Sequence, residues 1–355
     1  MQALRLIAGK TAKARIEQAG LTPDLVRMVI GASGGPKWLI LRQLDQLVFG
    51  HWLAQSDRHI DLVGSSIGAW RMTCAAHPDA AATFNRFQQV YFEYRYTKGQ
   101  TISQITQASY DFLHDIFSPG MMQDIVANKK RNLNIVAVKG KGITGSHNKY
   151  IELAGLLVAA GANTVSRKSL SWFYDRVVLH SGAAPALSEQ WQDYSRVDIA
   201  LTADNLDHAL MASGSIPFVV DPIKISGGAP AGIYRDGGVV DYHFDIPWRV
   251  AGGIILYPHF YSHLTPGWFD KRRKSRRAKG AVFDQMLLLS PTDDLISNLP
   301  FGRIPDRTDF TKMNDNDRLA FWHTVVGESG RLAEEFACLL EDHGKLMDRL
   351  ETAPE

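Results

Sequence analysis

Ser66 lies at the centre of the sequence GSSIG, residues 64–68, which follows a short apolar segment and precedes a helical pattern. Gly64 and Gly68 allow a tight turn between a strand and a helix, and such a turn places the serine Oγ above the edge of a sheet. The free amide groups at the start of the helix would also stabilise a developing oxyanion. The spacing therefore predicts that Ser66 is a nucleophile, whereas Ser65, which is off-centre, is expected to make a turn or cap hydrogen bond.

A second glycine-containing turn, SGGPK at residues 33–37, follows an apolar segment at residues 26–30. Gly34 and Gly35 let backbone N–H groups approach a ligand closely, and a helix that starts near Lys37 would add its positive dipole end. Such a loop suits an anion, either a phosphate or the oxyanion of a tetrahedral intermediate. It has neither the Walker spacing nor the G-x-G-x-x-G spacing of a dinucleotide site.

A nucleophilic serine needs a base, and the sequence offers two kinds. In an α/β-hydrolase triad the histidine follows the serine and the acid, and four histidines are candidates on this order alone: His243, His259, His263 and His323. The other candidate is Asp236, which begins an Asp-Gly-Gly turn directly after Ile233 to Arg235. Gly237 and Gly238 expose the backbone beside this carboxylate, although Asp-Gly is also a common turn signal.

Four motifs, in this order along the chain, resemble the patatin-like phospholipase family of lipid acyl hydrolases. The family's glycine-rich oxyanion loop is similar to residues 33–37, and its G-x-S-x-G elbow is similar to residues 64–68. Its Ala-Ser-x-x-x-Pro block is similar to residues 212–217, and its Asp-Gly-Gly motif to residues 236–238. The resemblance covers residues 28–247.

The first loop departs from the family pattern at three positions. Ser33 stands where the family has a further glycine, and Lys37 and Trp38 stand where it has arginine and then glycine. Lys37 keeps the positive charge but not the planar guanidinium group. The large Trp38 side chain must change the packing around the loop.

The resemblance implies a catalytic dyad without histidine, in which Ser66 attacks the ester carbonyl and Asp236 accepts the serine proton. It implies that the amides of Gly34 and Gly35 hold the oxyanion, and that water hydrolyses an acyl-enzyme. An unperturbed aspartate has a pKa of about 3.9, so burial is expected to make this carboxylate a stronger base. No metal and no cofactor are expected. Six further residues support the motifs: Ser33, Lys37, Gly64, Gly68, Gly237 and Gly238.

Apolar runs of strand length alternate with helical patterns through the first two thirds of the chain, which predicts an α/β fold with a mostly parallel sheet. The resemblance implies a three-layer α/β/α arrangement. We expect an N-terminal helical segment at residues 1–25, a catalytic core at 26–250, and a C-terminal extension at 251–355 that packs on the core. The aromatic-rich segments 91–118 and 166–191 could form a lid, the wall of an acyl pocket, or ordinary core.

The composition is that of a globular protein with a formal net charge of +2, so overall charge indicates no partner. Two cysteines do not make a disulfide framework, and no apolar run approaches the roughly 20 residues of a membrane span. The basic N-terminus lacks the apolar core of a secretory signal. The expected location is the cytoplasm, with peripheral membrane contact as an addition.

The segment DKRRKSRRAK, residues 270–279, contains seven basic residues and one acidic residue. From Lys271 to Lys279 it could contact anionic phospholipid, with Trp268 and Phe269 reaching into the interface. The same run could instead be a localisation signal or a solvated loop, and it is too short to predict a nucleic-acid-binding protein.

Two alternatives to a patatin-like hydrolase remain open at this stage. One is an esterase with a Ser-His-Asp triad, and the other is a non-catalytic protein that binds lipid surfaces. The expected substrate is a lipid ester or another carboxylic ester, and the sequence does not distinguish phospholipid, lysophospholipid and neutral glyceride.

Overall fold

The computed structural model describes residues 2–95, 99–182, 191 and 193–355. These residues form an α/β fold around one mixed sheet of ten strands, in the order β10-β1-β9-β8-β2-β3-β4-β5-β6, with β7 paired to β4. The strands are β1 Leu4–Ala8, β2 Val26–Gly31, β3 Ile60–Ser65, β4 Arg131–Gly140, β5 Tyr174–His180, β6 Arg196–Ala200, β7 Tyr234–Asp236, β8 Ile254–Pro258, β9 Met286–Pro291 and β10 Leu350–Thr352.

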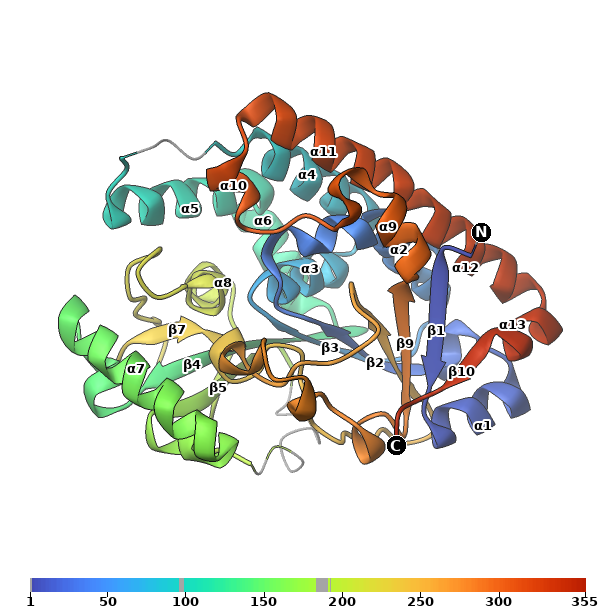
Figure 1. Ribbon diagram of the computed structural model, residues 1–355, viewed down its shortest axis with the longest axis horizontal. Helices are drawn as coiled ribbons and strands as arrows, with labels where there is room; N and C mark the ends of the chain where they lie inside the picture. The colour runs from blue at the N-terminus through green and yellow to red at the C-terminus, as the bar shows by residue number, and fades with distance from the viewer. Residues whose placement is uncertain (1, 96–98, 183–190, 192) are drawn as a thin grey trace.

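Helices flank this sheet and give the three-layer α/β/α arrangement (Figure 1). In the described residues they are α1 Lys10–Ala19, α2 Arg42–Leu47, α3 Ile67–Ala76, α4 Ala80–Glu93, α5 Ile102–Ile116, α6 Pro119–Ala127, α7 Lys149–Val165, α8 Leu206–Gly214, α9 Asp293–Asn298, α10 Asp309–Lys312, α11 Asp315–Glu328, α12 Gly330–Glu341 and α13 His343–Arg349. None of the described helices is long and apolar enough to cross a membrane.

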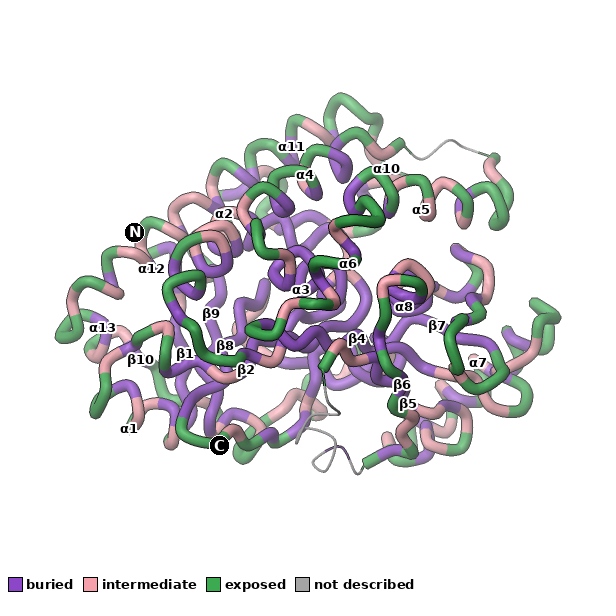
Figure 2. The backbone as a smooth tube through the Cα atoms, turned by 180° about the vertical axis from the view of Figure 1, so that it is seen from behind, coloured by how far each residue is buried: buried purple, intermediate pink, exposed green. Residues whose placement is uncertain are grey.

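The centre of the sheet is parallel. The neighbouring strands β9, β8, β2, β3 and β4 all run in one direction. Among the ten strands of the described residues, the antiparallel pairs are β1 with β9, and β5 and β7 with β4. Every residue of β8 and β9 is buried, as expected for parallel strands that are covered on both faces. The buried strands form the core of the molecule in Figure 2. The predicted α/β class and mostly parallel sheet are therefore confirmed.

The N-terminal segment differs from the expected helix. Residues 4–8 form β1, and the helix α1 begins only at Lys10. The sequence LRLIA pairs with β9 on one side and with β10 on the other, so its apolar side chains enter the main core. Tertiary pairing thus overrides a local pattern that suits a helix.

The expected boundary at residue 250 between a core and an extension does not match the order of strands in the sheet. β8, which follows this boundary, lies between β2 and β9 near the middle of the sheet, and β10 pairs with the N-terminal β1. Residues 251–355 therefore contribute three strands to the central sheet, and segments near the two ends of the chain meet in one pair of strands.

Candidate active site

Ser66 lies in a strained turn between β3 and α3. Its φ of 54° and ψ of −131° are unusual for a residue with a side chain, and strained backbone of this kind is typical of a nucleophile elbow. A Cβ on Gly64 would lie 2.5 Å from the carbonyl oxygen of Gly68, and a Cβ on Gly68 would lie 2.0 Å from that of Gly31. Only glycine therefore lets α3 start this close to the ends of β2 and β3.

Ser66 and Asp236 are brought together, although 170 residues separate them in sequence. The Oγ of Ser66 donates a hydrogen bond to Oδ2 of Asp236 at 2.8 Å, and both residues are buried, with 6% and 7% of their surface exposed. The other carboxylate oxygen, Oδ1, accepts a hydrogen bond from the N–H of Gly238 at 2.7 Å. The carboxylate is thus held by its own turn and faces the serine hydroxyl.

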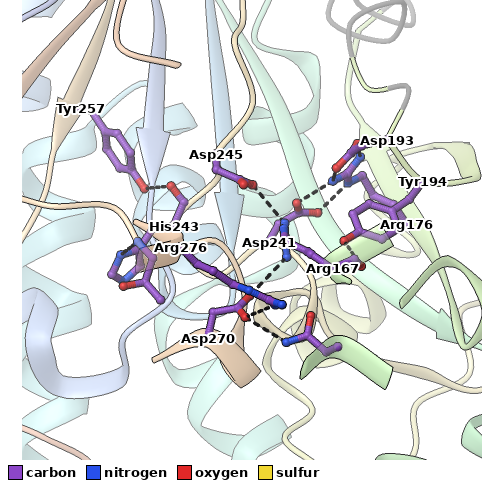
Figure 3. A network of polar contacts seen from close by, with 12 residues as sticks. Arg167, Arg176, Asp193, Tyr194, Asp241, His243, Asp245, Tyr257, Asp270 and Arg276 are labelled. Carbon is purple, nitrogen blue, oxygen red and sulfur yellow. Dashed lines mark hydrogen bonds and ion pairs between the residues drawn. The ribbon is translucent and has the colours of Figure 1, made fainter. Parts of the chain in front are cut away.

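The position of Asp236 follows from the pairing of β7 with β4. Asp236 lies opposite Ala137, and its N–H donates to the carbonyl oxygen of Ser215 at 2.9 Å. A Cβ on Gly237 would lie 2.3 Å from the carbonyl oxygen of Val136, so glycine is required where this turn crosses β4. The turn then continues to a buried ion pair, in which Asp241 accepts hydrogen bonds from the guanidinium of Arg176 on β5 (Figure 3).

Burial raises the pKa of Asp236, while the Ser66 hydroxyl, the Gly238 N–H, Arg307 and Lys271 oppose this shift. A carboxylate with a raised pKa is a stronger base once it is ionised. The arrangement therefore addresses the main chemical difficulty of an aspartate base.

The first glycine loop lies beside the serine. Ser33 donates from its N–H to the carbonyl oxygen of Tyr242 at 2.9 Å, and from its Oγ toward the carbonyl and hydroxyl oxygens of Ser65 at 3.1 and 3.0 Å. Gly34 is the N-cap of a 3-10 helix, Gly35–Leu41, and Gly35, its first residue, has a φ of 57°. Among the hydrogen bonds of the described residues, none uses the N–H of Gly34 or Gly35 as donor. These two amides are the available donors for an oxyanion.

Ser213 is a supporting residue that sequence reasoning did not single out, although it lies in the Ala-Ser-x-x-x-Pro block. Its Oγ accepts a hydrogen bond from the N–H of Ser66 at 2.8 Å and donates to the carbonyl oxygen of Val136 at 2.7 Å. Ser213 therefore connects the elbow to β4 and fixes the peptide group that precedes the Ser66 side chain.

Two cavities meet at Ser66. One has a volume of about 310 Å³ and is mainly apolar, and its wall includes Ile67, Trp70, Ile105, Phe112, Val219 and Phe310. The other has a volume of about 230 Å³ and contains Asp236 together with Lys37, Tyr242, Trp268, Lys271 and Asp306. Ser66, Ile216 and Arg307 line both.

One of the two aromatic-rich segments lines the apolar cavity. Part of its wall is formed by Tyr91, Tyr94, Ile105, Ser109 and Phe112, so described residues of the segment 91–118 line a pocket. The other segment, 166–191, includes β5, and its residues 183–190 lie outside the described part of the chain.

Three cations line the polar cavity. Lys37 is paired with Asp306, and the Nζ of Lys271 lies 4.2 Å from the ring centroid of Tyr242. Desolvation, reinforced by the charges of Arg307 and Lys37, lowers the pKa of Lys271 to about 8. Among the described residues the Arg307 guanidinium has no ion-pair partner. The cavity therefore holds excess positive charge next to the serine.

The sequence did not indicate Lys271 or Arg307 as site residues. Lys271 belongs to the basic run, and the sequence shows the charge of this run but not that one of its side chains lines a cavity. Arg307 is in an irregular segment before α10 with no motif around it.

The candidate histidine bases lie elsewhere. None of the four is among the described residues that line either cavity. Burial lowers the pKa of His259 to about 3 and that of His243 well below its ordinary value, so both are neutral. The Nδ1 of His243 accepts a hydrogen bond from the N–H of Thr265 at 3.0 Å. His263 stacks on Tyr261, and His323 packs edge-on against Phe92.

The described residues contain no group of three or more histidine, cysteine, aspartate or glutamate side chains placed to hold a metal ion. Comparison with known proteins identifies no relative, because no family model, no curated protein and no solved structure matches the chain.

Proposed function

We propose that this chain is a serine ester hydrolase of the patatin-like type, which cleaves carboxylic esters of lipids through a dyad of Ser66 and Asp236. The observation that carries the proposal is the hydrogen bond from the Ser66 Oγ to a buried carboxylate at the junction of two cavities. The order of the four motifs along the chain gives independent support.

In the proposed reaction, Asp236 accepts the hydroxyl proton while the Ser66 Oγ attacks the ester carbonyl carbon. The amides of Gly34 and Gly35 hold the oxyanion of the tetrahedral intermediate. The intermediate collapses to an acyl-enzyme, and the departing alcohol takes the proton from Asp236. Water then attacks the acyl group, gives its proton to Asp236 and releases the acid, and the proton returns to the Ser66 Oγ. No cofactor takes part.

The two cavities suggest how the substrate is placed. The apolar cavity suits the acyl chain, and the cavity with Lys37, Lys271 and Arg307 suits the alcohol part. Because this second cavity is positively charged, we propose that an alcohol with a phosphate or another anionic group is preferred. The proposed location is the cytoplasm, which the two unpaired cysteines favour.

The test is labelling with a fluorophosphonate together with hydrolysis of a short-chain p-nitrophenyl ester. We expect the wild type and His263→Ala to react, Ser66→Ala to lose both labelling and hydrolysis, and Asp236→Asn to react at least about a hundredfold more slowly. Full esterase activity in Ser66→Ala would refute the dyad. Loss of activity in His263→Ala with an unaffected Asp236→Asn would favour a histidine triad, and absence of turnover on every ester would favour a non-catalytic lipid-binding protein.

A further inference from the structure

Helix α7 presents an apolar face to solvent. Tyr150, Leu153, Leu157, Val158 and Val165 are all exposed, with 71% of Tyr150 and 88% of Val165 accessible. Successive members of this set are mostly three, four or seven residues apart, which places them along one stripe of the helix. Figure 2 shows the outer turns of α7 as exposed, at the edge of the molecule.

The orientation of α7 is the reverse of that of an ordinary surface helix. The only charged residue between positions 150 and 165 is Glu152, and it is buried in an ion pair with Arg235. Gly155, Ala159 and Asn163 also face the body of the protein. A surface helix normally turns its charged side chains to water and its apolar ones to the core, so this exposed stripe needs a partner.

Neighbouring segments extend the apolar face. The short helices Gly142–Gly145 and Arg167–Trp172 both pack against α7. Each adds an exposed apolar side chain, Ile143 from the first and Trp172 from the second, and 73% of Trp172 is accessible. Tryptophan beside aliphatic residues is typical of surfaces that enter the boundary between lipid headgroups and acyl chains.

The basic run is attached to the C-terminal end of this helix. Arg273 and Arg276 both donate hydrogen bonds to the carbonyl oxygen of Thr164, at 2.9 and 3.1 Å. Asp270 accepts a hydrogen bond from Asn163 of α7 at 2.9 Å. It accepts another from Arg276 at 2.8 Å (Figure 3). Arg273 and Arg276 of the basic run are therefore engaged in contacts within the protein. Trp268, which precedes the run, lies in the wall of the polar cavity.

Further exposed cations lie near both ends of the apolar face. Arg272 and Lys274 are exposed on either side of Arg273, which contacts Thr164 in the last turn of α7. Lys149 is exposed at the first residue of α7, and Lys168 is exposed in the short helix that follows. The apolar stripe is therefore flanked by positive charge at both ends and carries no exposed acidic residue between positions 150 and 165.

We propose that α7 docks on the surface of an anionic lipid bilayer, with its apolar stripe and Trp172 inserted and the surrounding lysines and arginines at the level of the headgroups. Charge complementarity selects this partner, because each basic residue near an anionic membrane adds favourable energy. A second copy of the chain would bring an identical basic surround to the interface. The proposal concerns binding alone and does not depend on the esterase activity.

Docking would also orient the candidate site. The ion pair of Glu152 with Arg235 connects α7 to β7, whose last residue is Asp236. Arg235 in turn donates a hydrogen bond to the carbonyl oxygen of Val220, a residue in the wall of the apolar cavity. The docking face is therefore fixed rigidly to the strand that carries the proposed base.

The test is co-sedimentation of the full chain with vesicles of phosphatidylcholine and phosphatidylglycerol in equal amounts, compared with pure phosphatidylcholine. The Ser66→Ala chain is used so that hydrolysis cannot alter the lipid. We expect binding to the anionic vesicles and a loss of at least about tenfold in affinity when Leu157→Asp and Val158→Asp are combined. Lys168→Gln, Arg272→Gln and Lys274→Gln should each weaken binding by about fivefold.

The matched control is Phe301→Asp, which places the same acidic side chain at an apolar residue that is 68% exposed outside this surface. It should bind vesicles as the parent chain does. The proposal is overturned if the α7 variant binds equally well, or if vesicle binding is absent and the α7 variant instead converts a dimer to a monomer in sedimentation velocity. The α7 substitutions in a chain with Ser66 should leave hydrolysis of a soluble ester unchanged, which separates a failure of docking from a failure of the proposed function.

Discussion

At the scale of single residues, the pH dependence of activity follows from the environment of Asp236. Burial raises the pKa of this carboxyl, and only its ionised form can accept the Ser66 proton. We therefore expect kcat/KM on a neutral soluble ester to rise with pH through a value above the ordinary pKa of aspartate. The measurement is kcat/KM determined over a range of pH values. If the increase of kcat/KM with pH disappears in His263→Ala, the base is a histidine instead.

The same burial predicts a stability cost. A raised pKa means that the folded chain holds the Asp236 proton more tightly than the unfolded chain. The contribution of this residue to the free energy of unfolding is therefore greatest at low pH, and it is lost as the pH rises through the pKa of the folded state. At neutral pH the buried charge is therefore unfavourable. Asp236→Asn should unfold at a higher urea concentration than the wild type at pH 7, with the difference shrinking toward pH 4. A lower midpoint at pH 7 would contradict this reasoning.

Backbone strain at Ser66 gives a second stability prediction. Its positive φ costs about 1–3 kcal/mol for a residue with a side chain, whereas glycine adopts it freely at an entropic cost of about 0.5–1 kcal/mol. Ser66→Gly and Ser66→Ala should both be inactive, and the glycine variant should be more stable by about 1 kcal/mol in urea unfolding. Equal or reversed stabilities would mean that the turn relaxes when the hydroxyl is removed.

At the scale of elements, the polar cavity should set the choice of alcohol. Arg307→Gln and Lys271→Gln are expected to reduce the ratio of kcat/KM for an anionic ester over a neutral one with the same acyl chain by about tenfold each. Because Lys271 has a pKa of about 8, the ratio should also fall as pH rises through that value. The control is Lys10→Gln, at an exposed residue of α1. An unchanged ratio in both cavity variants would remove the cavity from substrate selection.

Local patterns predicted elements best where one strand or helix carries the whole signal. The apolar run at residues 134–138 indicates a strand and lies within β4, and the helical pattern that follows Ser66 is α3. Residues 38–53 have apolar side chains at helical spacing, which indicates one helix, but the structure divides them into 3-10, α and π turns. There Trp38 stacks on Phe87 at 4.4 Å, and a Cβ on Gly50 would lie 3.0 Å from that of Ala81. These contacts with α4 are tertiary, so periodicity along the chain does not contain them.

The candidate site shows the same limit. Ser66 is indicated by its G-x-S-x-G spacing between a strand and a helix, whereas the role of Asp236 is implied by the resemblance of its Asp-Gly-Gly motif to the patatin-like family. Lys271 and Arg307 could not be assigned from sequence, because they enter the cavity from irregular segments whose path depends on the finished fold.

At the scale of the whole molecule, the sequence predicts the class of the sheet but not the order of its strands. Hydrophobic runs report that a strand is buried, and they do not report which strand lies beside it. The resemblance to a known family ends at residue 247, and residues 251–355 are expected to form an extension that packs on the core. The structure places β8 and β9 between β1 and β2 instead.

This strand order predicts that residues 1–250 do not fold alone. Without the rest of the chain β2 loses its neighbour β8, and β1 loses both β9 and β10. A parallel strand such as β2 would then lack hydrogen-bond partners at one edge and cover on its faces, and the remaining strands cannot replace either. The truncated chain should lack cooperative urea unfolding and be digested rapidly by protease. A chain ending at Thr352 is the control: it loses only the hydrogen bonds of Ala353 with Ala8 and of Gly280 with Pro354, and should stay folded. Cooperative unfolding of residues 1–250 would show instead that they are an independent domain, and that the C-terminal strands add to a sheet that is already stable.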